Sequence, residues 1–168
     1  MITSGSFADI GYFQSPIGCM IIEASEEVIS MISFTENYDN SKTVPTPLIS
    51  EMVCQLKAYF EGRLYHFNIP FHEEGSAFQQ KAWTKLEDIS FGTTLTYSEL
   101  AKEMGKPTAT RAVAAANGKN QLNILIPCHR VVGTQNKLSG YNGGIERKRW
   151  LLQHERSYSL NKIPGRLF

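Results

Sequence analysis

The sequence predicts an α+β protein built in two parts that meet near residue 75. Three short β-branched or aromatic runs and one helical repeat occupy the first part, whereas the second part is mainly helical in pattern. Residues 1–75 hold 3 basic and 10 acidic side chains, a net charge of −7, and residues 76–168 hold 14 basic and 6 acidic ones, a net charge of +8. This asymmetry indicates a polyanion-binding second part, although two solvated charge sets that attract each other would show the same pattern.

Length and composition are typical of a soluble globular protein with one or two small domains. The chain has 168 residues, of which 42% are hydrophobic. No run approaches the roughly 18 apolar residues of a membrane span, and the first ten residues do not resemble a signal peptide, so we expect a cytoplasmic protein. Its three cysteines are odd in number and widely spaced, which favours reduced thiols over a disulfide framework or a zinc ribbon: Cys19, Cys54 and Cys128.

The first part should fold as a small sheet covered by a helix. Residues 7–15, 18–25 and 28–34 are short runs separated by turn residues, and they predict the strands of a meander. Residues 47–62 repeat apolar side chains at helical spacing and stop at Gly62, which predicts a helix packed on that sheet. The side chains expected on its inner face are Ile49, Met52, Val53, Leu56, Tyr59 and Phe60.

The second part should open with a capped helix and continue as a helix-turn-helix. Residues 72–76 predict a joint, and Ser76 is a suitable N-cap for a helix over 77–88 whose apolar face is Phe78, Ala82, Trp83 and Leu86. A further helix should end at Gly105, and Pro107 should open another that runs to about Asn117 after a three-residue turn. An ordinary helical hairpin would give the same pattern.

The helix after Pro107 carries one long cation among small side chains. Arg111 alone projects far, because its neighbours are Thr108, Ala109, Thr110, Ala112, Ala114, Ala115 and Ala116. A slim face of this kind can approach the minor groove of DNA, which is only about 6 Å wide. The alternative is an alanine-rich core helix with Arg111 extending along its surface to solvent.

The stretch ILIPCHRVV, residues 124–132, places a thiol beside an imidazole. Its apolar start predicts a buried strand that ends at Pro127, so Cys128 should lie at a strand end. A buried cysteine is often only a small packing residue, but an adjacent His129 favours the nucleophilic thiolate. A helix with the inner face Trp150 and Leu151 supplies Glu155 and His154, which predicts a nucleophile, a base and an orienting carboxylate. Spacing alone does not show that these groups meet.

Four stretches of the second part share their order and spacing with one enzyme family. They read FQQKAWTKLEDISFGTTLTYSELA, TRAVAAANGKN, IPCHRVVG and LSGYNGGIERKRWLLQHE. Together they resemble the O6-alkylguanine-DNA alkyltransferase family, also called methylated-DNA–protein-cysteine methyltransferases. The resemblance covers residues 76–157 densely and the first 75 residues only in type. It implies a ribonuclease-H-like α/β domain over 1–75 and a winged-helix-like, DNA-binding and alkyl-accepting domain over 76–168.

The resemblance implies direct repair of double-stranded DNA. Such a protein flips O6-alkylguanine, and by extension O4-alkylthymine, out of the duplex and transfers the alkyl group irreversibly to its own cysteine, so each molecule acts once. Cys128 would accept the alkyl group and His129 would take the thiol proton through a water molecule. Glu155 would hold His129, and Asn120 would brace the turn that carries the nucleophile. Tyr97 would assist nucleotide rotation and donate its hydroxyl to the guanine ring.

The same resemblance implies further contacts with DNA and with the base. Arg111 matches the finger that enters through the minor groove and fills the gap in the base stack, on a slim face with Ala109, Thr110, Ala112 and Ala114. Tyr141 matches the lid aromatic against the flipped base, and the backbone near Asn142 matches the donor to O6. The carbonyl of Val131 matches the group that reads the guanine amino group. Hydrogen-bond donors directed at the departing guanine oxygen would stabilise the negative charge that develops on it.

Several positions depart from the family pattern. Gln121 and Asn123 replace common prolines, and Asn142 replaces a frequent serine or alanine at the pocket rim, which puts substrate breadth in doubt. The zinc-binding cysteine and histidine set of some relatives is absent, so we expect no metal and no cofactor. We also expect no methylphosphotriester-sensing domain, no membrane association, no obligate protein partner and a monomer.

Two other classes of function share some of these features. A thiol hydrolase or glutaminase would also use cysteine, histidine and a carboxylate, but it would turn over many times. A non-catalytic alkyltransferase-like DNA-binding protein would replace the nucleophile, commonly with tryptophan, and Cys128 argues against it.

Overall fold

The computed structural model describes residues 8–160 of the 168-residue chain. The described residues as far as Glu73 form one compact unit, and those from Glu74 onward form a second. Within residues 8–160, no helix has the length and apolar composition that crossing a membrane requires.

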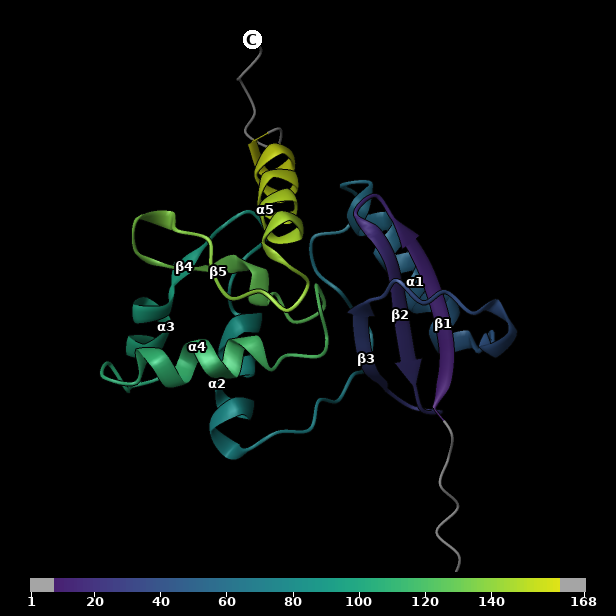
Figure 1. Cartoon of the computed structure of the whole chain (residues 1–168), viewed down its shortest axis with the longest axis horizontal. Coiled ribbons are helices and arrows are strands. Elements are labelled where there is room, and N and C mark those ends of the chain that lie inside the picture. The colour runs from purple at the N-terminus through teal and green to yellow at the C-terminus, as the bar shows by residue number, and fades with distance from the viewer. Residues whose placement is uncertain (1–7, 161–168) are drawn as a thin grey trace, which may run out of the picture. The chain divides into compact units, whose positions relative to one another are not determined.

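The first unit is organised around a three-stranded antiparallel meander (Figure 1). Its strands are β1 (Asp9–Ser15), β2 (Gly18–Ala24) and β3 (Ile29–Phe34), in the spatial order β1-β2-β3. This confirms the three predicted strands, except that Phe7 of the first lies outside the described residues. Buried Met20 and Ile22 on β2 alternate with more exposed neighbours, as expected where one face of a sheet meets the core.

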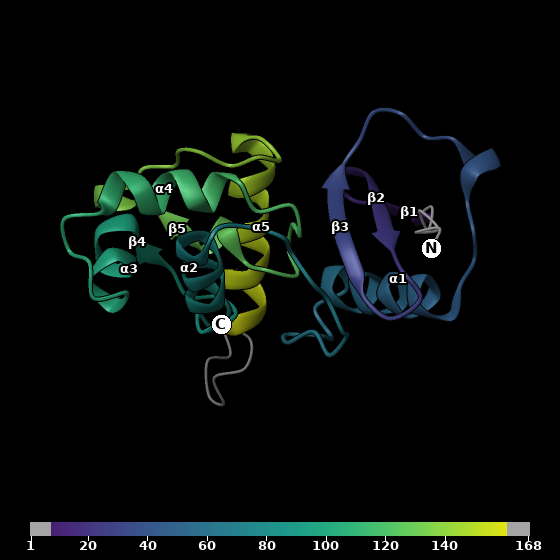
Figure 2. The ribbon, with the colours of Figure 1, turned by 90° about the horizontal axis from the view of Figure 1, so that it is seen from below.

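Helix α1 (Pro47–Phe60) covers one face of this sheet (Figure 2). It approaches β1 so closely that a Cβ atom added to Gly11 would lie 2.3 Å from Cγ2 of Ile49. Val53 is only half-buried, contrary to expectation, and Gln55 lies inside instead. Its amide nitrogen donates to the Glu51 carboxylate and to the Asn68 carbonyl, which offsets the cost of burying a polar side chain.

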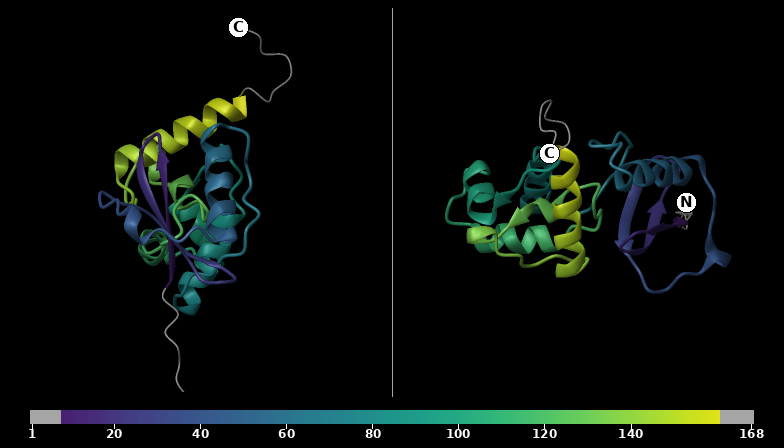
Figure 3. Two further views of the ribbon diagram at one scale, coloured as in Figure 1. Left: turned by 90° about the vertical axis from the view of Figure 1, so that its right-hand side faces the viewer. Right: turned by 90° about the horizontal axis from the view of Figure 1, so that it is seen from above.

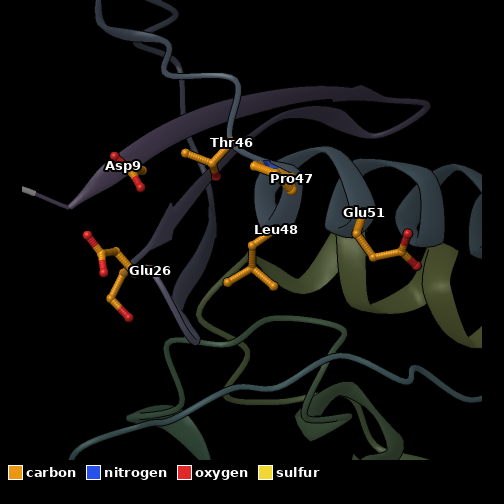
Figure 4. A pocket seen from close by; sticks show the side chains of 7 residues that line it. Asp9, Glu26, Thr46, Pro47, Leu48 and Glu51 are labelled. Atoms are coloured by element: carbon orange, nitrogen blue, oxygen red, sulfur yellow. The ribbon is translucent and has the colours of Figure 1, made fainter.

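A pocket of about 480 Å³ opens between the first strand and the start of α1 in this unit (Figure 4). Its lining consists of Asp9, Ser25, Glu26, Thr46, Pro47, Leu48 and Glu51. The lining contains carboxylates but no cysteine or histidine, and Cys128, His129 and Glu155 all lie in the second unit.

The second unit consists of four helices and a short parallel pair of strands in its described part. Helix α2 (Ala77–Glu87) begins with the predicted cap, because Ser76 and Gln79 form a reciprocal capping box. Trp83 of α2 donates to the Ala116 carbonyl at 2.9 Å and so ties α2 to α4 (Thr110–Gly118). Helix α3 (Tyr97–Glu103) packs against both α2 and α4.

The parallel pair lies next to the reactive segment. Strand β4 (Leu95–Thr96) pairs with β5 (Val131–Val132), and the turn η2 (Cys128–Arg130) directly precedes β5. Helix α5 (Ile145–Leu160), yellow in Figure 3, packs against η2. Two shorter turns complete the described elements: η1 (Asn40–Lys42) in the first unit and η3 (Thr134–Asn136) in the second.

The connection between α3 and α4 is longer than predicted. Helix α3 ends before Gly105 as expected, but Pro107 lies in a turn and α4 begins only at Thr110. The Lys106 carbonyl accepts from the Ala109 N–H at 2.9 Å and closes this turn separately from the helix. The mixed α+β class and the helix pair are confirmed, whereas the predicted three-residue turn is wrong.

Candidate active site

The segment before Cys128 is a buried tight turn and not the predicted strand. Ile124 and Leu125 form the turn, and Ile124 has a φ of 73°, which is strained for a β-branched residue. The Asn120 side chain bonds backbone groups of this segment: its Nδ2 donates to the Ile126 carbonyl at 3.0 Å, and its Oδ1 accepts from the Leu122 N–H at 2.8 Å. The structure therefore places Asn120 at the base of the turn that carries the thiol.

Cys128 begins the turn η2 immediately after Pro127. Its side chain is buried, with 1% of the residue exposed, and it is not in a disulfide. Its N–H donates to the Ile126 carbonyl at 2.8 Å, and its own carbonyl accepts from Nδ2 of Asn117 at 3.2 Å. The backbone on both sides of the sulfur is thus held by hydrogen bonds.

The structure brings His129 and Glu155 together, although 26 residues separate them in the chain. Nε2 of His129 lies 2.7 Å from Oε1 of Glu155, and both side chains are buried. Burial raises the pKa of Glu155, but its interactions with His129 and Arg130 outweigh burial and hold that pKa well below its usual range. Because an ionised carboxylate only accepts, the hydrogen of the neutral His129 ring belongs on Nε2, and Nδ1 carries the lone pair.

That lone pair is available to a proton. Burial lowers the pKa of His129 against the opposing influence of Glu155, so the ring is neutral near pH 7. Nδ1 is buried and has no hydrogen-bond partner among residues 8–160. A neutral imidazole with an open nitrogen next to a thiol can act as a general base, directly or through one water molecule.

Arg130 holds Glu155 from the other side and is not among the residues predicted from the sequence. Its Nε donates to Oε2 and its Nη2 to Oε1, both at 2.9 Å, while Nη1 donates to the Ile89 carbonyl. The Gly92 N–H adds a further bond to Oε2 at 3.0 Å. A Cβ atom on Gly92 would overlap Ser159, so only glycine lets the backbone at this position come so close to α5. The position of Arg130 directly after Cys128 and His129 is the signal that could have identified it.

Lys148 is another residue near the thiol that the sequence did not point out. It is fully buried, and its Nζ donates to the Ser139 carbonyl at 2.9 Å and approaches the Tyr97 hydroxyl at 3.5 Å. Burial lowers its pKa to about 8, and the nearby Cys128 opposes that shift. Lys148 precedes Glu155 by seven residues, so the two share one face of α5, and this spacing could have revealed it.

Tyr97 and Tyr141 both lie near Cys128. Tyr97 stands at the start of α3, where its hydroxyl donates to the Ser139 carbonyl at 3.1 Å. The ring of Tyr141 meets the His129 ring edge to face, with centroids 6.4 Å apart. The Tyr141 hydroxyl is buried without a hydrogen-bond partner in the described part of the chain, and burial raises its pKa well above the usual value.

The remaining predicted residues fall into buried and exposed groups. Val131 is fully buried in β5, and Asn142 is exposed. At the start of α4, Arg111 and Ala112 are exposed, and Thr110, Ala114 and the N-cap residue Ala109 are half-buried, so these residues are accessible and are not part of the core. His154 does not join Glu155 at the site, because its ring stacks on Trp150 with centroids 4.9 Å apart. Among the described residues no cluster of His, Cys, Asp or Glu is arranged to hold a metal ion.

Comparison with known proteins assigns both units to one family. The family model described as 6-O-methylguanine DNA methyltransferase, DNA binding domain, matches residues 77–157, and the one described as its ribonuclease-like domain matches residues 10–72. The methylated-DNA–protein-cysteine methyltransferase of Mycobacterium tuberculosis is 44% identical over 147 residues, which cover 85% of this chain and 89% of that protein. The protein of the same name from Haemophilus influenzae is 40% identical over 159 residues, covering 91% and 86%.

Solved structures agree with this assignment. The crystal structure of Mycobacterium tuberculosis O6-methylguanine methyltransferase matches with a TM-score of 0.81 and 40% identity, covering 90% of this chain and 94% of that one. The structure of Mycobacterium tuberculosis OGT in complex with DNA matches with a TM-score of 0.79 and 41% identity, covering 88% and 93%. With both domains matched and identities of 40% or more over most of its length, this chain belongs to the methylated-DNA–protein-cysteine methyltransferase family.

Proposed function

We propose that this protein repairs alkylated DNA directly by transferring the alkyl group of O6-alkylguanine to Cys128. The observation that carries the proposal is the arrangement behind the thiol. Cys128 is followed by a neutral His129 whose Nε2 is bonded to an ionised Glu155 and whose Nδ1 is open. The names of the similar proteins support the same reaction.

The transfer is a displacement at the alkyl carbon. The thiol proton moves to Nδ1 of His129 through a water molecule, and the thiolate attacks the carbon in line with the bond to O6. The carbon–sulfur bond forms as the carbon–oxygen bond breaks, and the electron pair stays on the guanine oxygen. Glu155 stabilises the imidazolium that forms. The imidazolium then gives the former thiol proton to the departing guanine, so the products are S-alkylcysteine and guanine.

The thioether product explains why each molecule would act once. Water does not cleave the carbon–sulfur bond of an S-alkylcysteine readily, so Cys128 would not be regenerated. Hydrogen bonds from the Tyr97 hydroxyl and from the backbone near Asn142 would stabilise the negative charge that develops on the departing base. Tyr141 would cover the extruded base, and the Val131 carbonyl would accept from its amino group. O4-alkylthymine is proposed as a second substrate.

DNA binding is assigned to the second unit. Its sequence from residue 76 has a net charge of +8, which favours sequence-independent contacts with phosphates. The exposed face of α4 would enter the minor groove, with Arg111 filling the gap left by the extruded nucleotide and its small neighbours Ala109, Thr110, Ala112 and Ala114 allowing close approach. A similar protein has been crystallised with DNA. We further propose a domain boundary near residue 75 and action as a cytoplasmic monomer without a cofactor.

The direct test uses a duplex with tritiated O6-methylguanine. After incubation with the protein, peptide mapping should find the label on Cys128 at no more than one methyl group per molecule. Cys128→Ala should abolish labelling while it preserves duplex binding, because the proposed phosphate contacts lie elsewhere. Label on Cys19 or Cys54 would refute the assignment. Release of the label into solution over many turnovers would favour the thiol hydrolase instead.

A further inference from the structure

Lys148 is a buried cation that the proposed reaction does not yet use. It lies on α5 and is 0% exposed. Burial lowers its pKa to about 8, and the influence that opposes this shift comes from Cys128 and not from a carboxylate. An ammonium group that is buried without a carboxylate costs the fold stability. Its place beside the thiol therefore indicates a role in the site.

The ammonium group of Lys148 shares an acceptor with Tyr97. Nζ of Lys148 donates to the Ser139 carbonyl at 2.9 Å, and the Tyr97 hydroxyl donates to the same oxygen at 3.1 Å. A carbonyl oxygen has two lone pairs, so it accepts both hydrogens. Nζ also lies 3.5 Å from the Tyr97 oxygen and 5.7 Å from the centre of the Tyr97 ring.

The Ser139 carbonyl anchors the segment that precedes α5. This segment, residues 139–144, carries Tyr141 and Asn142, which the proposed reaction places around the base. The bond from the Gly144 N–H to the Tyr141 carbonyl is local to the segment. The two bonds to the Ser139 carbonyl, by contrast, come from α3 and α5. They help to fix the segment against the helices of the second unit.

The proposed reaction removes one of these two bonds. Tyr97 has one hydroxyl hydrogen, and in the reaction this hydrogen is directed at the guanine ring. Lys148 then remains as a donor to the Ser139 carbonyl, so the segment stays anchored. Because an ammonium group has three hydrogens, a second one is available to the Tyr97 oxygen at 3.5 Å. A hydroxyl whose oxygen accepts from a cation is itself a stronger donor.

We propose that Lys148 is a positioning residue that releases the Tyr97 hydroxyl to the base, because it keeps the Ser139 carbonyl bonded and polarises the Tyr97 oxygen. This inference rests on the proposed function. Lys148 keeps its proton throughout, so the bonds that form and break are those of the transfer to Cys128. Since Lys148 acts through the Tyr97 hydroxyl, its effect on the rate requires that hydroxyl.

A double-mutant cycle tests this requirement. Single-turnover rates of Cys128 alkylation are measured for wild type, Lys148→Met, Tyr97→Phe and the double variant. The substrate is O6-methylguanine in single-stranded DNA, so that extrusion does not limit the rate. Lys148→Met, which is similar in length and has no donor, should slow the wild-type protein by about tenfold. In the Tyr97→Phe background the same change should slow transfer by less than about threefold.

Two further variants separate this role from damage to the fold. Leu151→Ala, another buried change on α5, should change the rate by the same factor in both backgrounds. Lys148→Gln keeps a donor without the charge, and its smaller loss should likewise disappear in the Tyr97→Phe background. It also provides the cycle if Lys148→Met does not fold.

The cycle distinguishes failure of the inference from failure of the proposed function. Equal losses from the Lys148 change in both backgrounds would overturn the inference and leave Lys148 as a structural residue. A wild-type protein that does not alkylate Cys128 would instead refute the proposed function.

Discussion

The two sides of the His129 ring differ in how completely their polar atoms are bonded. On the Nε2 side, Glu155 accepts from His129, Arg130 and Gly92, and Arg130 also contacts the Ile89 carbonyl. Nδ1 of the ring, by contrast, lacks a hydrogen-bond partner in the described structure, and so do two other buried atoms of nearby side chains, Tyr141 Oη and Asn117 Oδ1.

This difference shows which part of the site is complete without substrate. The bonded side can hold the imidazole in one tautomer and one orientation, because each charge there has an opposite charge or a donor. The open side retains acceptors and a hydroxyl for water and for the base. We therefore expect changes on the bonded side to reduce both stability and rate, and changes on the open side to act mainly on the substrate.

Glu155→Gln should cause the largest loss. The interaction with Glu155 raises the pKa of His129, so a neutral amide leaves a weaker base and a less favourable imidazolium. The single-turnover rate on O6-methylguanine duplex should fall by about a thousandfold. Glu146→Gln, an exposed change on the same helix, is the control and should leave the rate unchanged. A wild-type rate in Glu155→Gln would show that the carboxylate does not orient the base.

Arg130→Met should destabilise the protein by about 3 kcal/mol, because it leaves a buried carboxylate without its cation. Urea unfolding at pH 7 measures the change. Arg149→Met, which removes an exposed ion pair on α5, should cost less than about 1 kcal/mol. Similar losses in the two variants would contradict the view that the bonded side is a stabilising unit.

The effect of Arg130→Met should depend on pH. In the folded protein the pKa of Glu155 lies below the value of about 4.3 for an unperturbed glutamate, so its ionisation stabilises the fold above that pH. This contribution is lost as the pH falls and the carboxylate takes up a proton. The stability difference between wild type and Arg130→Met should therefore be greatest near neutral pH and shrink below about pH 4. A difference that stays constant with pH would separate Arg130 from the ionisation of Glu155.

Arg111→Ala should slow base extrusion without changing the hydrogen bonds around the His129 ring. If Arg111 fills the gap in the stack, the variant should lose about tenfold in rate on duplex and almost nothing on free O6-benzylguanine, because a free base needs no extrusion. Part of the loss should be recovered when the lesion lies in a mismatch or in single-stranded DNA. Equal fractional losses on duplex and free base would show that Arg111 supports the fold or the pocket.

Tyr141→Phe should have the smallest effect on stability. It removes a buried hydroxyl that has no partner among the described residues and keeps the aromatic ring. The free energy of unfolding should change by less than about 1 kcal/mol, and removal of an unpartnered group can even stabilise the fold. A loss as large as that of Arg130→Met, measured by the same urea unfolding, would mean that the Tyr141 hydroxyl forms a stabilising hydrogen bond in solution.

Much of the fold follows from local patterns in the sequence. The three strands have period-2 or β-branched runs between turn residues, and the start of α2 follows from the reciprocal bonds that Ser76 and Gln79 can form within four residues. The adjacency of Cys128 and His129 was likewise visible, and a shared face of α5 could have indicated Lys148. These features depend on residues near one another in the chain.

The features that the sequence did not determine depend on contacts between distant segments. The apolar run at 124–126 has the composition of a strand, but the Asn120 side chain bonds both ends of the segment and closes it as a turn. The Nε2 atom of His129 reaches Glu155 only because η2 packs against α5, and Arg130 and Gly92 then add their bonds to the same carboxylate. Sequence by itself determined the three strands of the first unit, the presence of the helices and the reactive residue types, but not the short strands β4 and β5. Tertiary packing decided which atoms of those residues are bonded and which remain open, because hydrogen bonds of this kind depend on positions in space and not on separation along the chain.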